Sequence, residues 1–149
     1  MKPKILIIGS TGKLGKKLLN FCNSKKVNIF PIKCFKNNKL LLHQSNKYKI
    51  NFFFTLSNTN DEINFKLFLK RKKIDIIYFL DYGYRSLVYA DIFLNNNNKS
   101  IIAIANKELI IAGGDTLIDK IQKTKNKLIP LDSEHFSLKN NNINNDNLT

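Results

Sequence analysis

The stretch GSTGKLG, residues Gly9–Gly15, decides the fold of this chain. It follows an apolar run, Lys4–Ile8, that has the pattern of a short buried strand. It opens a segment, Lys13–Asn23, whose apolar residues recur at helical spacing. The glycines would let the backbone turn tightly and approach a pyrophosphate, and the N-terminus of the following helix would offer that anion free N–H groups. A strand, a glycine-rich turn and a helix in this order therefore indicate an α/β domain that binds a dinucleotide.

The spacing G-x-x-G-x-x-G is a relative of the G-x-G-x-x-G dinucleotide fingerprint, and an ordinary strand-to-helix turn remains the alternative. No Gly-Lys-Ser/Thr ends the loop, so it is not a Walker loop. The ribose of the cofactor is normally recognised at the end of the second strand, where a carboxylate favours NAD. Here the segment 33–37 holds no carboxylate, and Lys33 or Lys36 could meet the 2′-phosphate of NADP. Lysine is common throughout this chain, so a lysine at this position could be incidental. The lack of a carboxylate together with the two lysines nevertheless favours NADP.

Strands and helices alternate along the rest of the chain. The expected strands are continuous apolar runs, which is typical of a mostly parallel sheet covered on both faces. We therefore predict a Rossmann-like, doubly wound α/β domain over residues 1–138 and a disordered Asn-rich tail over 139–149. The remaining strands are expected at Val27–Lys33, Ile50–Thr55, Ile74–Leu80, Ser100–Ala105 and Lys127–Leu131, and the remaining helices at Asn37–Gln44, Asp61–Lys72, Ser86–Leu94 and Glu108–Lys123.

Two features interrupt these patterns. Pro31 has no N–H to donate, so it suits an edge strand or the end of a strand. Gly113-Gly114 lies inside the last expected helix and should weaken or kink it, at about 1 kcal/mol per glycine. Asp75 is expected at the entry to the strand that follows it.

The composition excludes several classes of protein. With 149 residues and 43% hydrophobic residues, the chain can bury one core and is not disordered throughout. Its net charge of +14 comes almost wholly from lysine, with Arg71 and Arg85 the only arginines, in a chain also rich in Asn, Ile and Phe. That mix follows from A+T-rich codons, so the charge is weak support for nucleic-acid binding. No apolar run could span a membrane, and two cysteines make no disulfide scaffold, so a soluble, cytoplasmic protein is expected.

Two further strand ends carry polar side chains at the edge where parallel sheets bind ligands. Asn106-Lys107-Glu108 begins a helix, so Asn106 and Glu108 could simply cap it, while Lys107 could bind a phosphate or carboxylate. Asp132-Ser133-Glu134-His135 follows the last strand. Residues two apart in an extended segment point to one side, so Asp132 and Glu134 could share Mg²⁺ or Mn²⁺. Capping of a helix by Asp132 or Ser133 is the alternative.

In their order and spacing, the glycine stretch, Ala-Asn-Lys-Glu at 105–108 and Pro-Leu-Asp-Ser-Glu-His at 130–135 resemble 1-deoxy-D-xylulose 5-phosphate reductoisomerase. This family makes 2-C-methyl-D-erythritol 4-phosphate in the non-mevalonate pathway of isoprenoid biosynthesis. The resemblance covers about residues 2–138 and corresponds to the N-terminal NADPH-binding domain of the family and its first metal ligands. It implies a metal-assisted rearrangement of a keto sugar phosphate followed by hydride transfer from NADPH.

The resemblance also implies roles for individual residues. The cofactor-binding residues would be Thr11, Gly12, Lys13 and Leu14 at the pyrophosphate, Lys36 and Asn37 at the adenosine phosphate, and Asn106 and Glu108. The metal ligands would be Asp132 and Glu134, for Mg²⁺ or Mn²⁺. Lys107, Ser133 and Glu134 would contact the sugar phosphate substrate, with Lys107 and Glu134 catalytic.

The chain departs from the family at several points. Lys13 replaces the usual small residue of the glycine loop, and Phe35 replaces the glycine of a Gly-Lys-Asn segment. The third metal carboxylate, the substrate-phosphate residues, the catalytic lid and the helical C-terminal domain of the family have no counterpart before residue 149. The chain is thus expected to be a truncated enzyme, a split gene product or a remnant, inactive without a separately encoded C-terminal half. The family is homodimeric, and the oligomeric state of this chain is left open. A non-catalytic or degenerate dinucleotide-binding module is the alternative.

Overall fold

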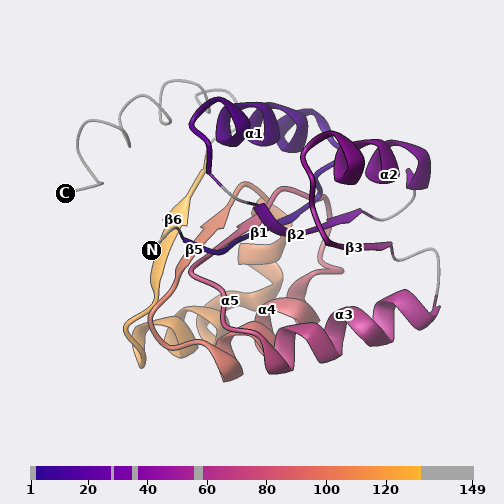
Figure 1. The fold of residues 1–149 in the computed structure, drawn as a ribbon. Coiled ribbons are helices and arrows are strands. Elements are labelled where there is room, and N and C mark those ends of the chain that lie inside the picture. Colours follow the sequence, from indigo (N-terminus) through magenta and orange to yellow (C-terminus); the bar gives the residue numbers. More distant parts are fainter. Residues whose placement is uncertain (1–2, 28, 35–36, 56–58, 132–149) are drawn as a thin grey trace.

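The structure is a computed structural model that describes residues 3–27, 29–34, 37–55 and 59–131. Strands and helices alternate along these residues (Figure 1). The elements are β1 (Ile5–Ile8), α1 (Lys13–Ser24), β2 (Ile29–Cys34), α2 (Asn38–Lys47), β3 (Phe52–Thr55), α3 (Thr59–Arg71), β4 (Ile76–Phe79), α4 (Leu87–Asn96), β5 (Ile101–Ile104), α5 (Lys107–Gln122) and β6 (Lys127–Pro130). The predicted tail, 139–149, lies outside the described residues.

The six strands form one parallel sheet in the order β3-β2-β1-β4-β5-β6. From β1 the chain first builds outward through β2 to β3, then crosses back with α3 and builds outward the other way from β4. The strand order therefore reverses between β1 and β4, which is where doubly wound sheets bind ligands. The predicted Rossmann-like, doubly wound fold is confirmed.

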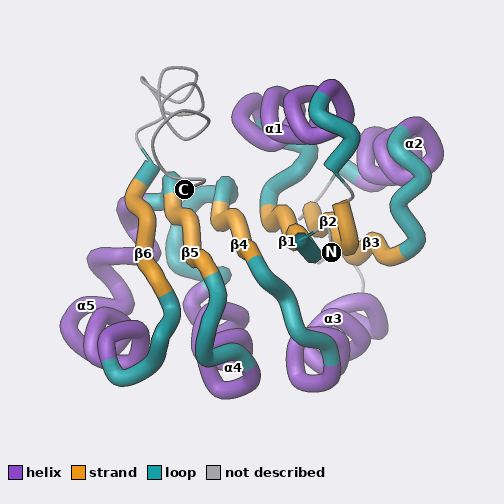
Figure 2. The backbone as a smooth tube through the Cα atoms, turned by 60° about the vertical axis from the view of Figure 1, so that its left-hand side comes forward, coloured by secondary structure: helices purple, strands orange, loops and turns teal. Residues whose placement is uncertain are grey.

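Helices cover both faces of the sheet. α1 and α2 lie over β1–β3 on one face, while α3, α4 and α5 lie on the other (Figures 1 and 2). Successive strand residues point to opposite faces, and β5 follows this rule: Ile102 and Ile104 join the core cluster beneath α3–α5, and Ala103 joins the cluster beneath α1. The central strand β1 is buried along its whole length, and burial on both faces explains its continuous apolar run.

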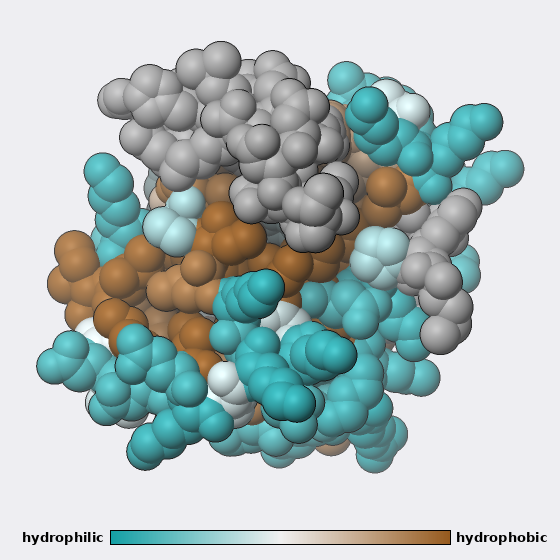
Figure 3. All heavy atoms as spheres, turned by 90° about the vertical axis from the view of Figure 1, so that its left-hand side faces the viewer, coloured by the Kyte–Doolittle hydropathy of each residue, from teal (hydrophilic) through white to brown (hydrophobic). Residues whose placement is uncertain are grey.

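One part of the sheet is left uncovered by the described helices. On the face that α1 and α2 occupy, none of the described helices lies over β4, β5 and β6 (Figure 2). Ile76, Tyr78 and Ile129 are half-buried on this side. Figure 3, which views the molecule from the side that lies at the left in Figure 1, shows a continuous hydrophobic area there.

One expectation about the strands is wrong. Pro31 lies in β2, which is an internal strand between β1 and β3, and not at an edge or a strand end. The pairing of β2 with β1 shifts between Ile5, opposite Ile29, and Ile7, opposite Ile32, so β2 carries one extra residue there. A bulge of this kind leaves one residue out of the ladder, which allows a proline inside the sheet.

The other element predictions hold to within a few residues at each end. α2 is longer than expected because it continues past Gln44 to Lys47, where the Tyr48 N–H closes the last turn on the Gln44 carbonyl. Asp75 stands at the entry to β4, and its carboxylate accepts a hydrogen bond from the Lys4 N–H at 2.7 Å. The expected kink of α5 is at Gly114, whose φ of 51° and ψ of −146° are not helical. Among the described residues no helix has the length and apolar character needed to cross a membrane.

Candidate functional site

A cleft of about 680 Å³ opens at the point where the strand order reverses. Segments that follow β1, β4, β5 and β6 line it, so it lies at the carboxyl ends of these strands. This is the edge where open α/β sheets bind their ligands. The lining residues are Gly12, Lys13, Leu14, Lys17, Leu80, Asp81, Tyr82, Ala105, Asn106, Lys107, Glu108 and Leu131.

The glycine loop is pressed between β4 and α1. Gly9 has φ +92°, and a Cβ there would lie 2.8 Å from the backbone of Leu80 and Asp81. A Cβ on Gly15 would lie 2.3 Å from the Gly9 carbonyl oxygen and 2.5 Å from the Ser10 Cα. Only glycine fits at these two positions, since each faces backbone that cannot move aside. The close approach of these backbone segments determines the path of the loop between β4 and α1.

Gly12 differs from the other two glycines. It is the N-cap of α1, with an extended backbone, φ −78° and ψ 177°, that any residue can adopt. The nearest atom to a Cβ built there is the Gly9 oxygen, at an ordinary 3.5 Å. The protein itself therefore leaves room for a side chain at Gly12, and that room faces the cleft.

The start of α1 has the properties of an anion site. Gly12 provides no side-chain cap and the first turn holds no acidic residue, so within the part of the chain that the structure describes no side chain caps the N–H groups of that turn. Lys13 and Lys17, one turn apart, are exposed and line the same cleft. Free N–H groups, the helix dipole and two ammonium groups together suit a pyrophosphate.

The start of α5 forms the opposite wall. Asn106 is buried, its Oδ1 accepts a hydrogen bond from the Leu109 N–H at 3.2 Å, and its Nδ2 donates to the Gly83 carbonyl. The capping interpretation of Asn106 is thus confirmed, and the same side chain ties the loop after β4 to α5. Lys107 and Glu108 remain exposed at the cleft, and the kink at Gly114 makes the part of α5 that bears them a short helix of its own.

Six lining residues were not predicted as site residues from the sequence: Lys17, Leu80, Asp81, Tyr82, Ala105 and Leu131. Asp81 is buried, with 6% of its surface accessible, and its Oδ2 accepts a hydrogen bond from the Ser86 hydroxyl at 2.6 Å. The sequence does indicate this segment, because Asp81 follows a strongly apolar strand. The carboxyl end of that strand lies at the edge of the sheet where the glycine loop, Asn106–Glu108 and Asp132–Glu134 are expected.

The structure brings together six of the predicted residues: Gly12, Lys13, Leu14, Asn106, Lys107 and Glu108 all line the cleft. Two others lie elsewhere. Thr11 is half-buried in the loop and is not a lining residue, and Asn37 caps α2, where its Oδ1 accepts a hydrogen bond from the Leu40 N–H at 3.1 Å. The remaining predicted residues, Lys36, Asp132, Ser133 and Glu134, lie outside the described residues.

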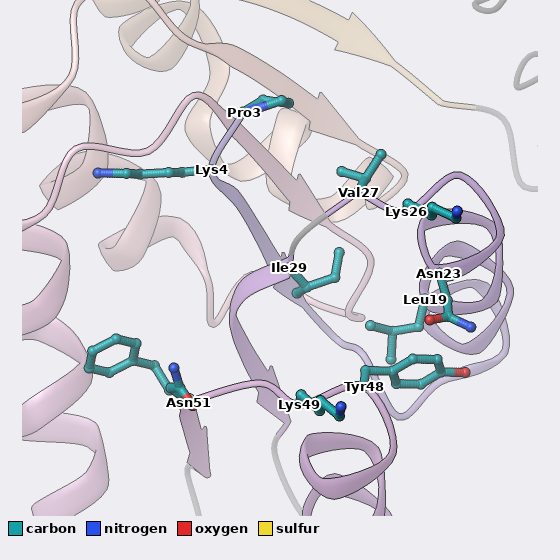
Figure 4. Close-up of a pocket in the computed structure, with 11 residues that line it drawn as sticks. Pro3, Lys4, Leu19, Asn23, Lys26, Val27, Ile29, Tyr48, Lys49 and Asn51 are labelled. Carbon is teal, nitrogen blue, oxygen red and sulfur yellow. The ribbon is translucent and has the colours of Figure 1, made fainter. Parts of the chain in front are cut away.

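A second cavity, of about 600 Å³, lies at the opposite edge of the sheet, where β1, β2 and β3 begin. Its basic residues are Lys4, Lys26 and Lys49, and Figure 4 shows their side chains pointing in different directions. Lys26 and Lys49 follow α1 and α2 with positive φ values of 55° each, and so terminate these helices. The ammonium groups do not converge, and the amino ends of parallel strands are not where such sheets bind ligands.

Burial shifts the pKa of two side chains that lie outside the cleft, Cys22 and Tyr78. Burial raises the pKa of the Cys22 thiol to about 11, so this thiol is protonated and unreactive at neutral pH. Burial, reinforced by Cys22, raises the pKa of Tyr78 to about 12. Within the described residues no three His, Cys, Asp or Glu side chains gather as a metal site.

Known proteins are similar to most of this chain. No family model matches it. The 1-deoxy-D-xylulose 5-phosphate reductoisomerase of Pelagibacter ubique is 33% identical over 158 residues, which cover 91% of this chain and 39% of that protein. The chain spans about 40% of the length of the curated relatives it matches, and it fits their N-terminal part.

Solved structures of the same enzyme share the fold. The reductoisomerase from Zymomonas mobilis in complex with NADPH has a TM-score of 0.76 at 19% identity, over 91% of this chain and 40% of that one. A reductoisomerase in complex with NADPH, fosmidomycin and magnesium has a TM-score of 0.74 at 20% identity, over 89% of this chain and 37% of that one.

Proposed function

We propose that this chain is the NADPH-binding half of a 1-deoxy-D-xylulose 5-phosphate reductoisomerase, and that it binds the dinucleotide in the cleft at the carboxyl ends of β1, β4, β5 and β6. The observation that carries the proposal is the cleft itself, which brings the uncapped start of α1 opposite Lys107 and Glu108 of α5. The relatives that resemble the chain over nine-tenths of its length are reductoisomerases.

The residues present fit a dinucleotide. A ligand pyrophosphate would accept hydrogen bonds from the first N–H groups of α1, next to Lys13 and Lys17, because no side chain among the described residues caps that end. Bound NADPH would supply the hydride of the reaction. Lys107 would hold an anionic group of the substrate as a point charge from the other wall, and Glu108 would stabilise the start of α5.

The isolated chain is expected to bind NADPH at least about tenfold more tightly than NADH, a difference of roughly 1.4 kcal/mol. No carboxylate follows β2, where it would repel the 2′-phosphate, and α2 begins there with its positive end and Lys39. Titration followed by nucleotide fluorescence measures both affinities.

A matched variant, Asn37→Asp, tests the same prediction. The carboxylate can still cap α2 by accepting from the Leu40 N–H, so the fold should be kept. The added negative charge should lower the affinity for NADPH and change that for NADH little. Equal affinity of the parent chain for the two nucleotides would contradict the preference.

Asp132 and Glu134 are proposed as ligands of Mg²⁺ or Mn²⁺, on their spacing directly after Leu131, which lines the cleft. Two carboxylates leave most of the octahedral positions of such a cation to water, so we expect weak binding. Electron paramagnetic resonance of Mn²⁺ would measure it, and Asp132→Asn should weaken it further. Asp119→Asn, which removes an exposed carboxylate of α5, should not. Tight binding by the parent, or equal effects of the two variants, would show that these residues are not the site.

Turnover is expected to need more than these 149 residues, because catalysis requires a substrate held in place and shielded from water. On this proposal the chain works in the cytoplasm on a sugar phosphate, together with the remaining part of the enzyme. The purified chain should therefore show no reductoisomerase activity. NADPH oxidation that depends on 1-deoxy-D-xylulose 5-phosphate, above a metal-free control, would refute this.

A further inference from the structure

Gln44 of α2 is buried against the glycine loop, although it lies outside the cleft. Only 3% of its surface is accessible, and Ser10, which it contacts, is completely buried. The two residues are joined by two hydrogen bonds in opposite directions. The Ser10 hydroxyl donates to Gln44 Oε1 at 3.0 Å, and Gln44 Nε2 donates to the Ser10 carbonyl at 2.8 Å. These bonds link residues 34 positions apart in the chain.

The bond to the Ser10 carbonyl fixes a peptide plane of the loop. In a trans peptide the carbonyl and the following N–H point in opposite directions. With the Ser10 carbonyl held towards α2, the N–H of Thr11 is directed away from α2. No peptide of the described structure is cis, so this relation holds for the Ser10–Thr11 bond. Without Gln44 the plane could rotate, which would change the path of the loop just before Gly12, the first residue of the loop that lines the cleft.

Gln44 holds Ser10 from the side of α2. Ser10 is already confined by α1, where a Cβ on Gly15 would lie 2.5 Å from its Cα, and Gln44 confines it from α2. A buried glutamine needs hydrogen-bond partners for its amide, and Ser10 supplies one for the Oε1 and one for the Nε2 of Gln44.

We propose that Gln44 is a positioning residue of the nucleotide site: its two hydrogen bonds to Ser10 hold the glycine loop in the conformation that receives the pyrophosphate. The inference rests on the proposed function, because it assigns Gln44 a role at the same dinucleotide site. It predicts that Gln44 governs affinity for the pyrophosphate part of the cofactor, without touching the cofactor.

The test compares variants of α2 in the full chain. Gln44→Met keeps the volume of the side chain and removes both hydrogen bonds, and Gln44→Asn keeps an amide that is one methylene too short to reach Ser10. The control is Ser45→Ala, which removes a buried hydroxyl of the next residue that bonds only locally, to the Leu42 carbonyl at 2.8 Å. Each variant is measured well below its melting temperature, with circular dichroism to establish that it is folded.

Partners that hold metal ligands in place change affinity by about 10–100-fold when they are removed, and we expect the lower end of that range here. Both Gln44 variants should bind NADPH and NADH about tenfold more weakly, with the ratio of the two affinities unchanged. Adenosine 2′-monophosphate, which has no pyrophosphate, should bind all variants equally. Ser45→Ala should bind NADPH like the parent chain.

Three results would overturn the inference. If either folded Gln44 variant binds NADPH as the parent does, Gln44 does not position the loop, and the proposed function stands. If the Gln44 variants bind adenosine 2′-monophosphate as much more weakly as they bind NADPH, Gln44 stabilises α2 in general and does not position the loop for the pyrophosphate. If the parent chain itself does not bind NADPH, the proposed function fails and the role of Gln44 fails with it.

Discussion

A chain with valine at position 12 is expected to fold and to lose NADPH binding. The extended backbone of Gly12 is one that β-branched residues favour, and the nearest protein atom to the new Cβ lies 3.5 Å away. Valine is a poor N-cap, so a loss of about 1 kcal/mol in stability is expected. Its methyl groups, however, would occupy the space in front of the first N–H groups of α1. The affinity for NADPH should fall by at least about a hundredfold, or ~2.8 kcal/mol.

Nucleotide fluorescence measures the binding, and circular dichroism with urea unfolding measures the fold. Gly12→Ala is the graded control, since one methyl group should block the pyrophosphate less than three carbons do. Retention of NADPH binding by folded Gly12→Val would mean that the cofactor does not approach the start of α1.

The opposite outcome is expected at Gly15, where alanine should prevent stable folding. Its Cβ would lie 2.3 Å from the Gly9 oxygen and 2.5 Å from the Ser10 Cα, and both are backbone atoms. Relief requires α1 to move away from the loop, which should reduce the free energy of unfolding by about 3 kcal/mol or more. Urea unfolding measures this loss.

Gly12→Ala is the matched control for Gly15→Ala. The nearest atom to a Cβ at position 12 is the Gly9 carbonyl oxygen, at an ordinary 3.5 Å, so no backbone has to move. Its loss in the free energy of unfolding should be about 1 kcal/mol or less, the cost of a poorer N-cap. A Gly15→Ala chain that unfolds within about 1 kcal/mol of the parent would show that α1 does not press on the loop as described.

The order and type of the elements could be predicted from the sequence because the signals are local. Buried parallel strands are apolar at every position, and helices such as α1 repeat their apolar residues at 3.6 spacing, so neighbouring residues suffice to identify them. The position of Pro31 inside the sheet could not be predicted in this way, because a bulge opposite β1 depends on how two strands pair. Its position inside the sheet follows from tertiary structure alone.

The candidate site was predictable in part for the same reason. The glycine loop and Asn106–Glu108 stand out as motifs, and the cleft contains both. Gln44 does not stand out as part of a motif, since a glutamine in a Lys- and Asn-rich helix is expected at the surface. Its function in the loop depends on α2 folding back beside Ser10. Asp81 could have been found by applying the strand-end rule to β4 as well.

The face of β4–β6 that the described helices leave uncovered also bears on the solubility of the purified chain. The molecule combines an apolar area with a net charge of +14, so repulsion between molecules opposes the attraction between their apolar areas. Salt shortens the range of that repulsion from about 10 Å at 0.1 M to about 3 Å at 1 M. Sulfate and phosphate additionally strengthen apolar association. The chain should therefore stay monomeric in buffers of low ionic strength and self-associate when the salt concentration is raised.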